Sequence, residues 1–108
     1  MSRPLYQLKA EFFKTLGHPV RIRVLELLGQ REQAVSELLA AIAIEPANLS
    51  QHLAVLRRAG LVTTRKDGSA VHYSVTGHRV PELLAVARSI LTGVLSEQIE
   101  LLQGLRTP

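Results

Sequence analysis

Residues 48–62 read NLSQHLAVLRRAGLV, the pattern of an amphipathic helix that ends at a glycine. At about 100° per residue, Leu49, Leu53 and Leu56 fall within one narrow arc of such a helix. The opposite side carries short, mostly polar side chains, namely Ala47, Asn48, Ser50, Gln51, Ala54 and Arg58. The leucines can hold the helix against a core while the other face stays open. Small and polar side chains on an open face suit contact with the edges of DNA bases.

A shorter helix is expected just before this one, and the two together predict a helix-turn-helix over about residues 34–59. The shorter helix carries apolar residues at helical spacing, namely Val35, Leu38, Leu39 and Ile42. The link to the next helix is only about three residues long, and Pro46 fits the first turn of that helix. Two helices joined by so tight a turn are typical of this motif.

Two β-prone runs follow, at residues 61–65 and 70–75. Residues 66–69 between them read KDGS, and Asp-Gly is a strong signal for a hairpin turn. On the second run Val71, Tyr73 and Val75 share one face, while His72 and Ser74 share the other. We expect this hairpin to form a wing over about residues 61–75, so that the chain is a winged helix-turn-helix.

Three further helices are expected from the spacing of apolar residues. The first covers about residues 4–16, the second begins at Pro19 and ends at Gly29, and the last covers about residues 80–105. His18 directly precedes the second helix, where we expect it to act as a cap. The predicted fold class is mainly α with a small β-hairpin (α+β), with four helices, two strands and a final helix. All of it fits one domain, residues 1–108.

The last predicted helix carries more apolar surface than one small domain can cover. A seam runs along it, formed by Leu83, Ile90, Val94, Leu101 and Leu105. The seam is widened by Leu84, Ala87, Leu91, Leu95 and Leu102. Exposed apolar surface of this extent marks an interface, and two-fold dimers are the commonest oligomers. We therefore expect residues 4–16 and 80–105 to form a homodimer interface; the alternative is packing within a monomer.

The net charge of +4 is concentrated in residues 46–79. That segment holds five basic residues against the single acid Asp67, namely Arg57, Arg58, Arg65, Lys66 and Arg79, and the rest of the chain is balanced. A basic patch is the electrostatic footprint of phosphate binding, so double-stranded DNA is the expected partner. The predicted base or near-base contacts are Asn48, Ser50, Gln51 and His52. The predicted phosphate or minor-groove contacts are Arg57, Arg58, Arg65 and Lys66.

Several classes of protein are disfavoured by the composition. There are no cysteines, which removes disulfides, thiolate metal sites and cysteine nucleophiles. No run approaches the ~18 apolar residues of a membrane span. The first residues run into Lys9 and Glu11 rather than a signal peptide, so a soluble cytoplasmic protein is expected. Glycine-rich phosphate loops and Gly-x-Ser-x-Gly are missing, and Ser50 and His52 diverge on their helix, so no enzyme is expected.

Four parts of the chain together resemble ArsR/SmtB-type bacterial repressors. Residues 12–28, FFKTLGHPVRIRVLELL, are similar to the opening signature of this family, and residues 35–38, VSEL, to its third helix. Residues 48–62 keep the core Ser-x-His-Leu-x-x-Leu-x-x-Ala-Gly-Leu-Val, and residues 71–75, VHYSV, are similar to the end of its wing. The resemblance implies a homodimeric winged-helix repressor that binds an inverted-repeat operator and releases it when an effector binds.

Many members of the family that the chain resembles sense metals, but the usual ligands are missing here. Residues 34–43 offer only Ser36 and Glu37, and residues 80–105 contain neither His nor Asp. The weak candidates for a metal site are His72, His78, Glu82, Glu97 and Glu100. Carboxylates without imidazole make a poor site for Zn or Ni, so no cofactor is expected. Two alternatives stay open: a Ni- or Zn-responsive repressor with a non-standard His/Glu site, and a dimeric adaptor whose sensing comes from a partner protein.

Overall fold

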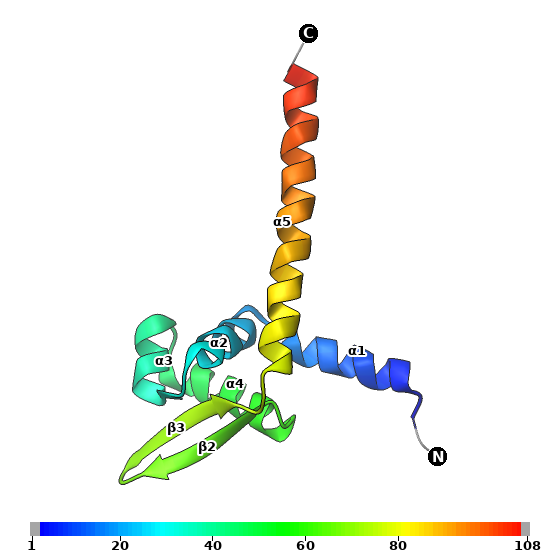
Figure 1. Cartoon of the computed structure of the whole chain (residues 1–108). Coiled ribbons are helices and arrows are strands. Elements are labelled where there is room, and N and C mark those ends of the chain that lie inside the picture. Colours follow the sequence, from blue (N-terminus) through cyan, green and yellow to red (C-terminus); the bar gives the residue numbers. More distant parts are fainter. Residues whose placement is uncertain (1–2, 107–108) are drawn as a thin grey trace.

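The computed structural model describes residues 3–106. Three helices lie together beside a small sheet, and two further helices project from them (Figure 1). The elements are α1 (Leu5–Leu16), α2 (Pro19–Gln30), β1 (Gln33–Ala34), α3 (Val35–Ala41), α4 (Pro46–Arg58), β2 (Val62–Asp67), β3 (Ala70–Val75) and α5 (Arg79–Arg106). The predicted order of helices and hairpin is confirmed. One strand, β1, was not predicted.

The sheet is antiparallel with the order β1-β3-β2. Strand β2 pairs with β3 from Val62 opposite Val75 to Asp67 opposite Ala70. The predicted four-residue turn is therefore two residues too long, because the strands continue until only Gly68 and Ser69 remain between them. Gly68 has φ of +63°, a conformation that glycine adopts without strain. The wing is thus a tight two-residue hairpin.

The buried core joins the helix-turn-helix to α2, to the last residue of α1 and to the first residue of β2. It consists of Leu16, Val24, Leu25, Leu27, Leu28, Leu38, Ile42, Leu49, Leu53, Leu56 and Val62. The predicted inward stripe of α4 is confirmed, because Leu49 and Leu56 are fully buried and Leu53 is 2% exposed. Tyr73 and Val75 of β3 pack against the same core, as the predicted faces of that strand require. Burial on one side fixes which face of α4 stays open.

Helix α2 does not end at Gly29, as predicted, but continues to Gln30. Gly29 does not terminate the helix; its lack of a side chain leaves room for α5 to pack against α2. A Cβ atom built there would lie 3.3 Å from both Cβ and Cγ of Pro81 in α5. Gly29 therefore lets α5 start close against α2, which anchors the long helix to the domain at its first turns.

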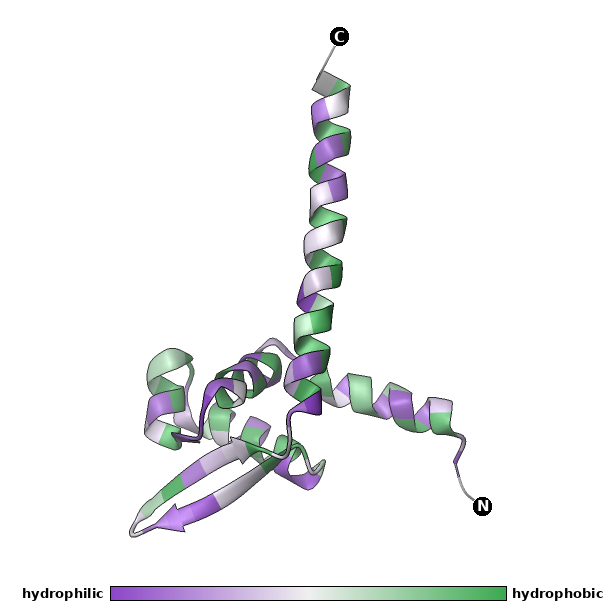
Figure 2. Ribbon diagram, in the orientation of Figure 1, coloured by the Kyte–Doolittle hydropathy of each residue, from purple (hydrophilic) through white to green (hydrophobic). Residues whose placement is uncertain are grey.

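Most of α5 beyond this anchor lies free of the domain, and apolar residues recur along its length (Figures 1 and 2). Its exposed large apolar residues are Val86, Ile90, Leu91, Val94, Leu95, Ile99, Leu101, Leu102 and Leu105. Helix α1 exposes Leu5, Tyr6, Leu8 and Phe13. These two helices are those in which the sequence predicted an interface. Within residues 3–106, no helix has the length and apolar character needed to cross a membrane.

Candidate nucleic-acid interface

Helix α4 begins and ends at residues suited to those positions. Pro46 occupies its first turn, where a missing N–H costs nothing. At its other end the N–H of Gly60 donates to Arg57 O and the N–H of Leu61 donates to Leu56 O. This pair of bonds, with φ of +76° at Gly60, is a Schellman motif. The helix therefore has a defined length, and the chain leaves it directly into the wing.

The open face of α4 carries three polar side chains that are free to bind a ligand. Asn48, Ser50 and Gln51 are exposed and have no intramolecular hydrogen-bond partner in the part of the chain that the structure describes. Arg57 and Arg58, in the last turn, are exposed as well. Six of the eight predicted contact residues therefore lie on α4, and all of them except His52 are exposed. Within residues 3–106, the side-chain donors and acceptors of these five residues make no hydrogen bond or ion pair.

His52 lies differently from the other predicted base contacts. Its ring is half-buried, and its centroid lies 4.1 Å from that of His18. Its Nδ1 lies 3.3 Å from Nη1 of Arg21 in α2. His18 in turn accepts a hydrogen bond from the N–H of Val20 at 3.2 Å, which confirms its predicted capping role. His52 therefore ties α4 to the start of α2.

Acidification is expected to weaken the contact of His52 with His18 and Arg21. Burial, followed by the charges of His18 and Arg21, holds the pKa of His52 below its ordinary value of 6.5. The neutral ring is thus favoured in the folded state, and its contribution to stability is complete above that ordinary value. The contribution is lost as the pH falls through the lower pKa of the folded state. We expect the melting temperature to decline over that range, and His52→Gln to remove this part of the decline. Identical pH profiles for the two proteins would contradict this assignment.

In the wing, the two predicted phosphate contacts differ in their surroundings. Arg65 is held by Glu32: its Nε lies 3.2 and 3.3 Å from the two carboxylate oxygens, and its Nη2 lies 2.5 Å from Oε1. Lys66 is exposed and has no ion pair within residues 3–106. The Glu32–Arg65 pair was missed from the sequence because the two residues are 33 positions apart. No local pattern links residues at that separation.

The weak metal candidates are not gathered into a site. His78 and Glu82 are neighbours, with Nε2 and Oε1 3.6 Å apart on the exposed start of α5. Glu97 and Glu100 lie near the far end of the same helix, and His72 lies on β3. Across residues 3–106, no three or more His, Cys, Asp or Glu side chains lie close enough to share an ion. Within one chain, these residues therefore offer no complete coordination sphere.

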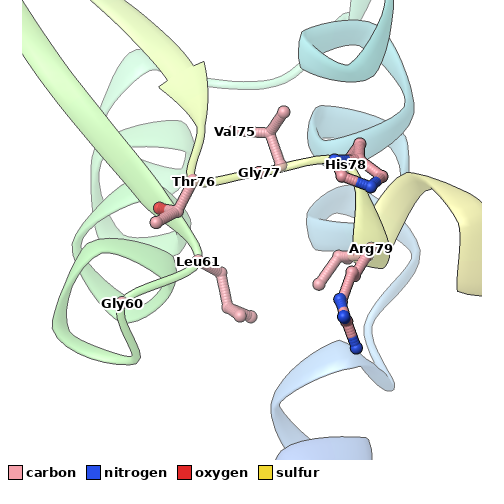
Figure 3. Close-up of a pocket in the computed structure, with 8 residues that line it drawn as sticks. Gly60, Leu61, Val75, Thr76, Gly77, His78 and Arg79 are labelled. Carbon is pink, nitrogen blue, oxygen red and sulfur yellow. The ribbon is translucent and has the colours of Figure 1, made fainter.

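A cavity of about 300 Å³ separates the end of α4 from the start of α5 (Figure 3). It is lined by Gly60, Leu61, Val75, Thr76, Gly77, His78, Arg79 and Val80. Gly77 has φ of +145°, a conformation that other residues rarely adopt. The link between the wing and α5 is therefore loosely packed. The anchor of α5 lies just beyond it, where Val80, Leu83 and Leu84 pack against the core.

Known proteins share both the sequence and the fold of this chain. A family model described as a helix-turn-helix domain matches residues 16–65. The HTH-type transcriptional regulator Rv0081 of Mycobacterium tuberculosis is 57% identical over 106 residues, which cover 97% of this chain and 93% of the relative. Its crystal structure superposes with a TM-score of 0.83, covering 91% of this chain and 99% of that one.

Two further relatives place the chain more narrowly. The transcriptional repressor SmtB homolog of Synechocystis is 36% identical over 83 residues, 77% of this chain and 63% of the relative. The solution structure of the homodimeric winged helix-turn-helix DNA-binding domain Mb0332 of Mycobacterium bovis, a possible ArsR-family regulator, has 29% identity and a TM-score of 0.76 over 86% of each chain. The chain belongs to the ArsR/SmtB-type family of winged helix-turn-helix transcriptional regulators. The family resemblance inferred from the sequence is thereby confirmed.

Membership of this family indicates which helix of the motif α4 is. In a helix-turn-helix the second helix enters the major groove, and its N-terminal residues meet the base edges. In this ArsR/SmtB-type regulator the second helix is α4, whose first turns carry Asn48, Ser50 and Gln51. These three exposed side chains thus lie on the N-terminal turns of the second helix of the motif.

Proposed function

We propose that this chain is a homodimeric repressor that binds an inverted-repeat operator and is released from it by an effector. The observation that carries the proposal is the division of α4 into two faces. Leu49, Leu53 and Leu56 are buried, whereas Asn48 and Gln51 are exposed and unpartnered among the described residues. A helix held firmly from one side and chemically free on the other is suited to reading a groove. We propose further that the chain acts in the cytoplasm and catalyses no reaction.

Each proposed contact follows from the chemistry of its side chain. The amides of Asn48 and Gln51 can pair in bidentate fashion with adenine, and the hydroxyl of Ser50 can pair with several bases. Arg57, Arg58 and Lys66 are suited to phosphates, which set the register of the protein on the duplex. His52, which packs on His18, is proposed as a near-base residue that mainly holds α4 in position.

The proposed dimer rests on the exposed apolar surfaces of α1 and α5. Surfaces of this kind are rare on monomeric proteins unless they serve an interface. The homodimeric state of the M. bovis domain, which shares this fold, supports the same assembly here. A two-fold dimer would present two copies of α4 to half-sites roughly 34–36 Å apart, one turn of DNA. An inverted repeat is the DNA sequence that matches this symmetry.

A gel-shift and anisotropy titration on the DNA upstream of the chain's own coding sequence tests the proposal. We expect the promoter fragment to bind at least ~10³-fold more tightly than a scrambled duplex of the same length at physiological salt. Equal affinity for the two duplexes would contradict sequence-specific binding. Failure to bind any duplex at low salt would favour the alternative of a dimeric adaptor, in which the winged helix no longer contacts DNA.

Replacing Gln51 by alanine is expected to relax operator choice without unfolding the protein. Losing one bidentate base contact should reduce the discrimination between operator and scrambled duplex roughly 10- to 100-fold. Gln30→Ala, which removes an exposed glutamine at the end of α2, is the matched control and should leave discrimination unchanged. If Gln51→Ala discriminates as well as the Gln30→Ala control does, Gln51 does not read a base.

A further inference from the structure

Glu32 is held in a fixed place between α2 and the wing. Its neighbour Gln33 is buried, and the Gln33 side-chain amide donates a 2.7 Å hydrogen bond to the carbonyl of Leu27 in α2. Gln33 also begins β1, where it pairs with Tyr73 of β3. Because antiparallel partners face the same side, Glu32 comes level with Ser74 on the outer face of the sheet. The position of Glu32 is therefore set by its neighbour.

From this position the Glu32 carboxylate reaches across β3 to β2. Its Oε2 accepts a 3.1 Å hydrogen bond from the hydroxyl of Ser74. Both oxygens contact Arg65, whose Nε and Nη2 form the edge with which a guanidinium grips an anion in bidentate fashion. These hydrogen bonds hold the pKa of Glu32 below its ordinary value, so the carboxylate is charged at neutral pH. The link between α2 and β1 is thus joined to both β2 and β3 through Glu32.

This ion pair changes the charge that the wing offers to DNA. Strand β2 carries the cations Arg65 and Lys66 together with Asp67 at its end. With Glu32 added, two cations face two carboxylates, and Lys66 is left as the unpaired cation of the wing within residues 3–106. The Arg65 and Glu32 side chains remain 55% and 36% exposed, so a phosphate can reach and compete for the guanidinium.

We propose that Glu32 is a positioning residue that withholds Arg65 from DNA phosphates and thereby lowers the affinity and the salt dependence of DNA binding. The proposal rests on the proposed DNA-binding function. A phosphate can engage the bidentate edge of Arg65 only after the carboxylate has released it. Glu32 is then left unpaired close to the negatively charged backbone. Each binding event therefore exchanges one ion pair for another instead of gaining one.

Removing the charge of Glu32 should release Arg65. We expect Glu32→Gln to bind duplex DNA about two- to fivefold more tightly near physiological salt, the scale of an exposed ion pair. The plot of log affinity against log salt should become steeper by roughly 0.5 to 1 unit, because one further phosphate contact releases counterions. Anisotropy titrations between ~50 and ~200 mM salt measure both quantities on the promoter fragment and on a random-sequence duplex. Glu26→Gln, which removes an exposed carboxylate from α2, is the matched control and should change neither quantity.

A double-mutant cycle separates release of Arg65 from a general loss of negative charge. In an Arg65→Ala background there is no guanidinium to release, so Glu32→Gln should alter affinity and salt slope much less than in the parent protein. Equal effects in the two backgrounds would show that Glu32 acts only through its long-range field, which would overturn the proposal. Melting temperatures of the four proteins reveal any structural loss.

The remaining outcomes are distinct from failure of the proposed function. If Glu32→Gln binds DNA more weakly, or with an unchanged salt slope, Glu32 merely supports the wing and the proposal is wrong. In that case the parent protein still prefers the promoter fragment. If the parent shows no preference but Glu32→Gln still steepens the salt slope on the random duplex, the operator proposal fails and the role of Glu32 stands. If the parent binds no duplex at all, both proposals fall.

Discussion

Replacing Val94 by glutamate is expected to dissociate the dimer and to abolish tight operator binding. Val94 lies in the middle of the apolar seam of α5, and Ile90, Leu101 and Leu105 lie within about 40° of it on the helix. The substitution would bury an unpaired carboxylate from each protomer, and the effective penalty is several kcal/mol per ion. We expect dimer affinity to fall by at least ~100-fold and operator affinity to fall with it, because each half-site contact would form alone.

Analytical ultracentrifugation of the Val94→Glu protein measures the assembly directly. Ser96→Glu is the matched control, since it adds the same carboxylate to an exposed position on roughly the opposite side of α5. Far-ultraviolet circular dichroism shows whether the winged helix stays folded. We expect it to, because the α5 residues that pack against the core within residues 3–106 are Val80, Leu83 and Leu84 in its first turns. A Val94→Glu protein that remains dimeric and binds the operator normally would place the interface elsewhere.

Leu53→Ala is expected to cause a large loss of stability. Leu53 is 2% exposed and belongs to the one core cluster that supports the helix-turn-helix. A buried leucine truncated to alanine loses about 2–5 kcal/mol of unfolding free energy. For a domain of this size that loss corresponds to a fall in melting temperature of roughly 10 °C or more.

The outward face of the same helix provides the comparison for Leu53→Ala. Gln51→Ala lies two residues away and is exposed, so its melting temperature should stay close to that of the parent protein. The two variants should thus separate folding from recognition. Leu53→Ala should lose stability, whereas Gln51→Ala should lose discrimination between operator and scrambled duplex. If Leu53→Ala melts at the parent temperature, the inward assignment of the α4 leucines is wrong.

The parts of the fold that were predicted correctly depend on local sequence signals. The leucine spacing of α4, Pro46 at its start and Gly60 after its end all act within a few residues of the helix, so the sequence alone defines the element. Asp-Gly in the wing is a similar signal, although pairing of Lys66 with Val71 and Asp67 with Ala70 narrowed the turn. Local signals therefore predicted the presence of each element more accurately than they predicted the residues at which the strands end.

The parts that were missed depend on contacts between distant residues. Strand β1 has only two residues and exists because Gln33 pairs with Tyr73, which no periodicity could indicate. Gly29 looked like a helix terminator but makes room for Pro81, 52 positions away. His52 was predicted as a base or near-base contact from its residue type, and its packing on His18, 34 positions away, could not be seen in the sequence. The Glu32–Arg65 ion pair also joins residues that are distant in the sequence. The charge that the wing presents, which depends on this pair, was therefore missed as well.

We propose that two copies of α4 read one operator as a two-fold unit. The stoichiometry and footprint of the parent protein on its own promoter fragment test this directly. We expect two protomers bound per site and protection of two half-sites whose centres are about 10–10.5 base pairs apart, or a multiple of that spacing. One protomer per site, or protection that moves unchanged to a scrambled duplex, would contradict it.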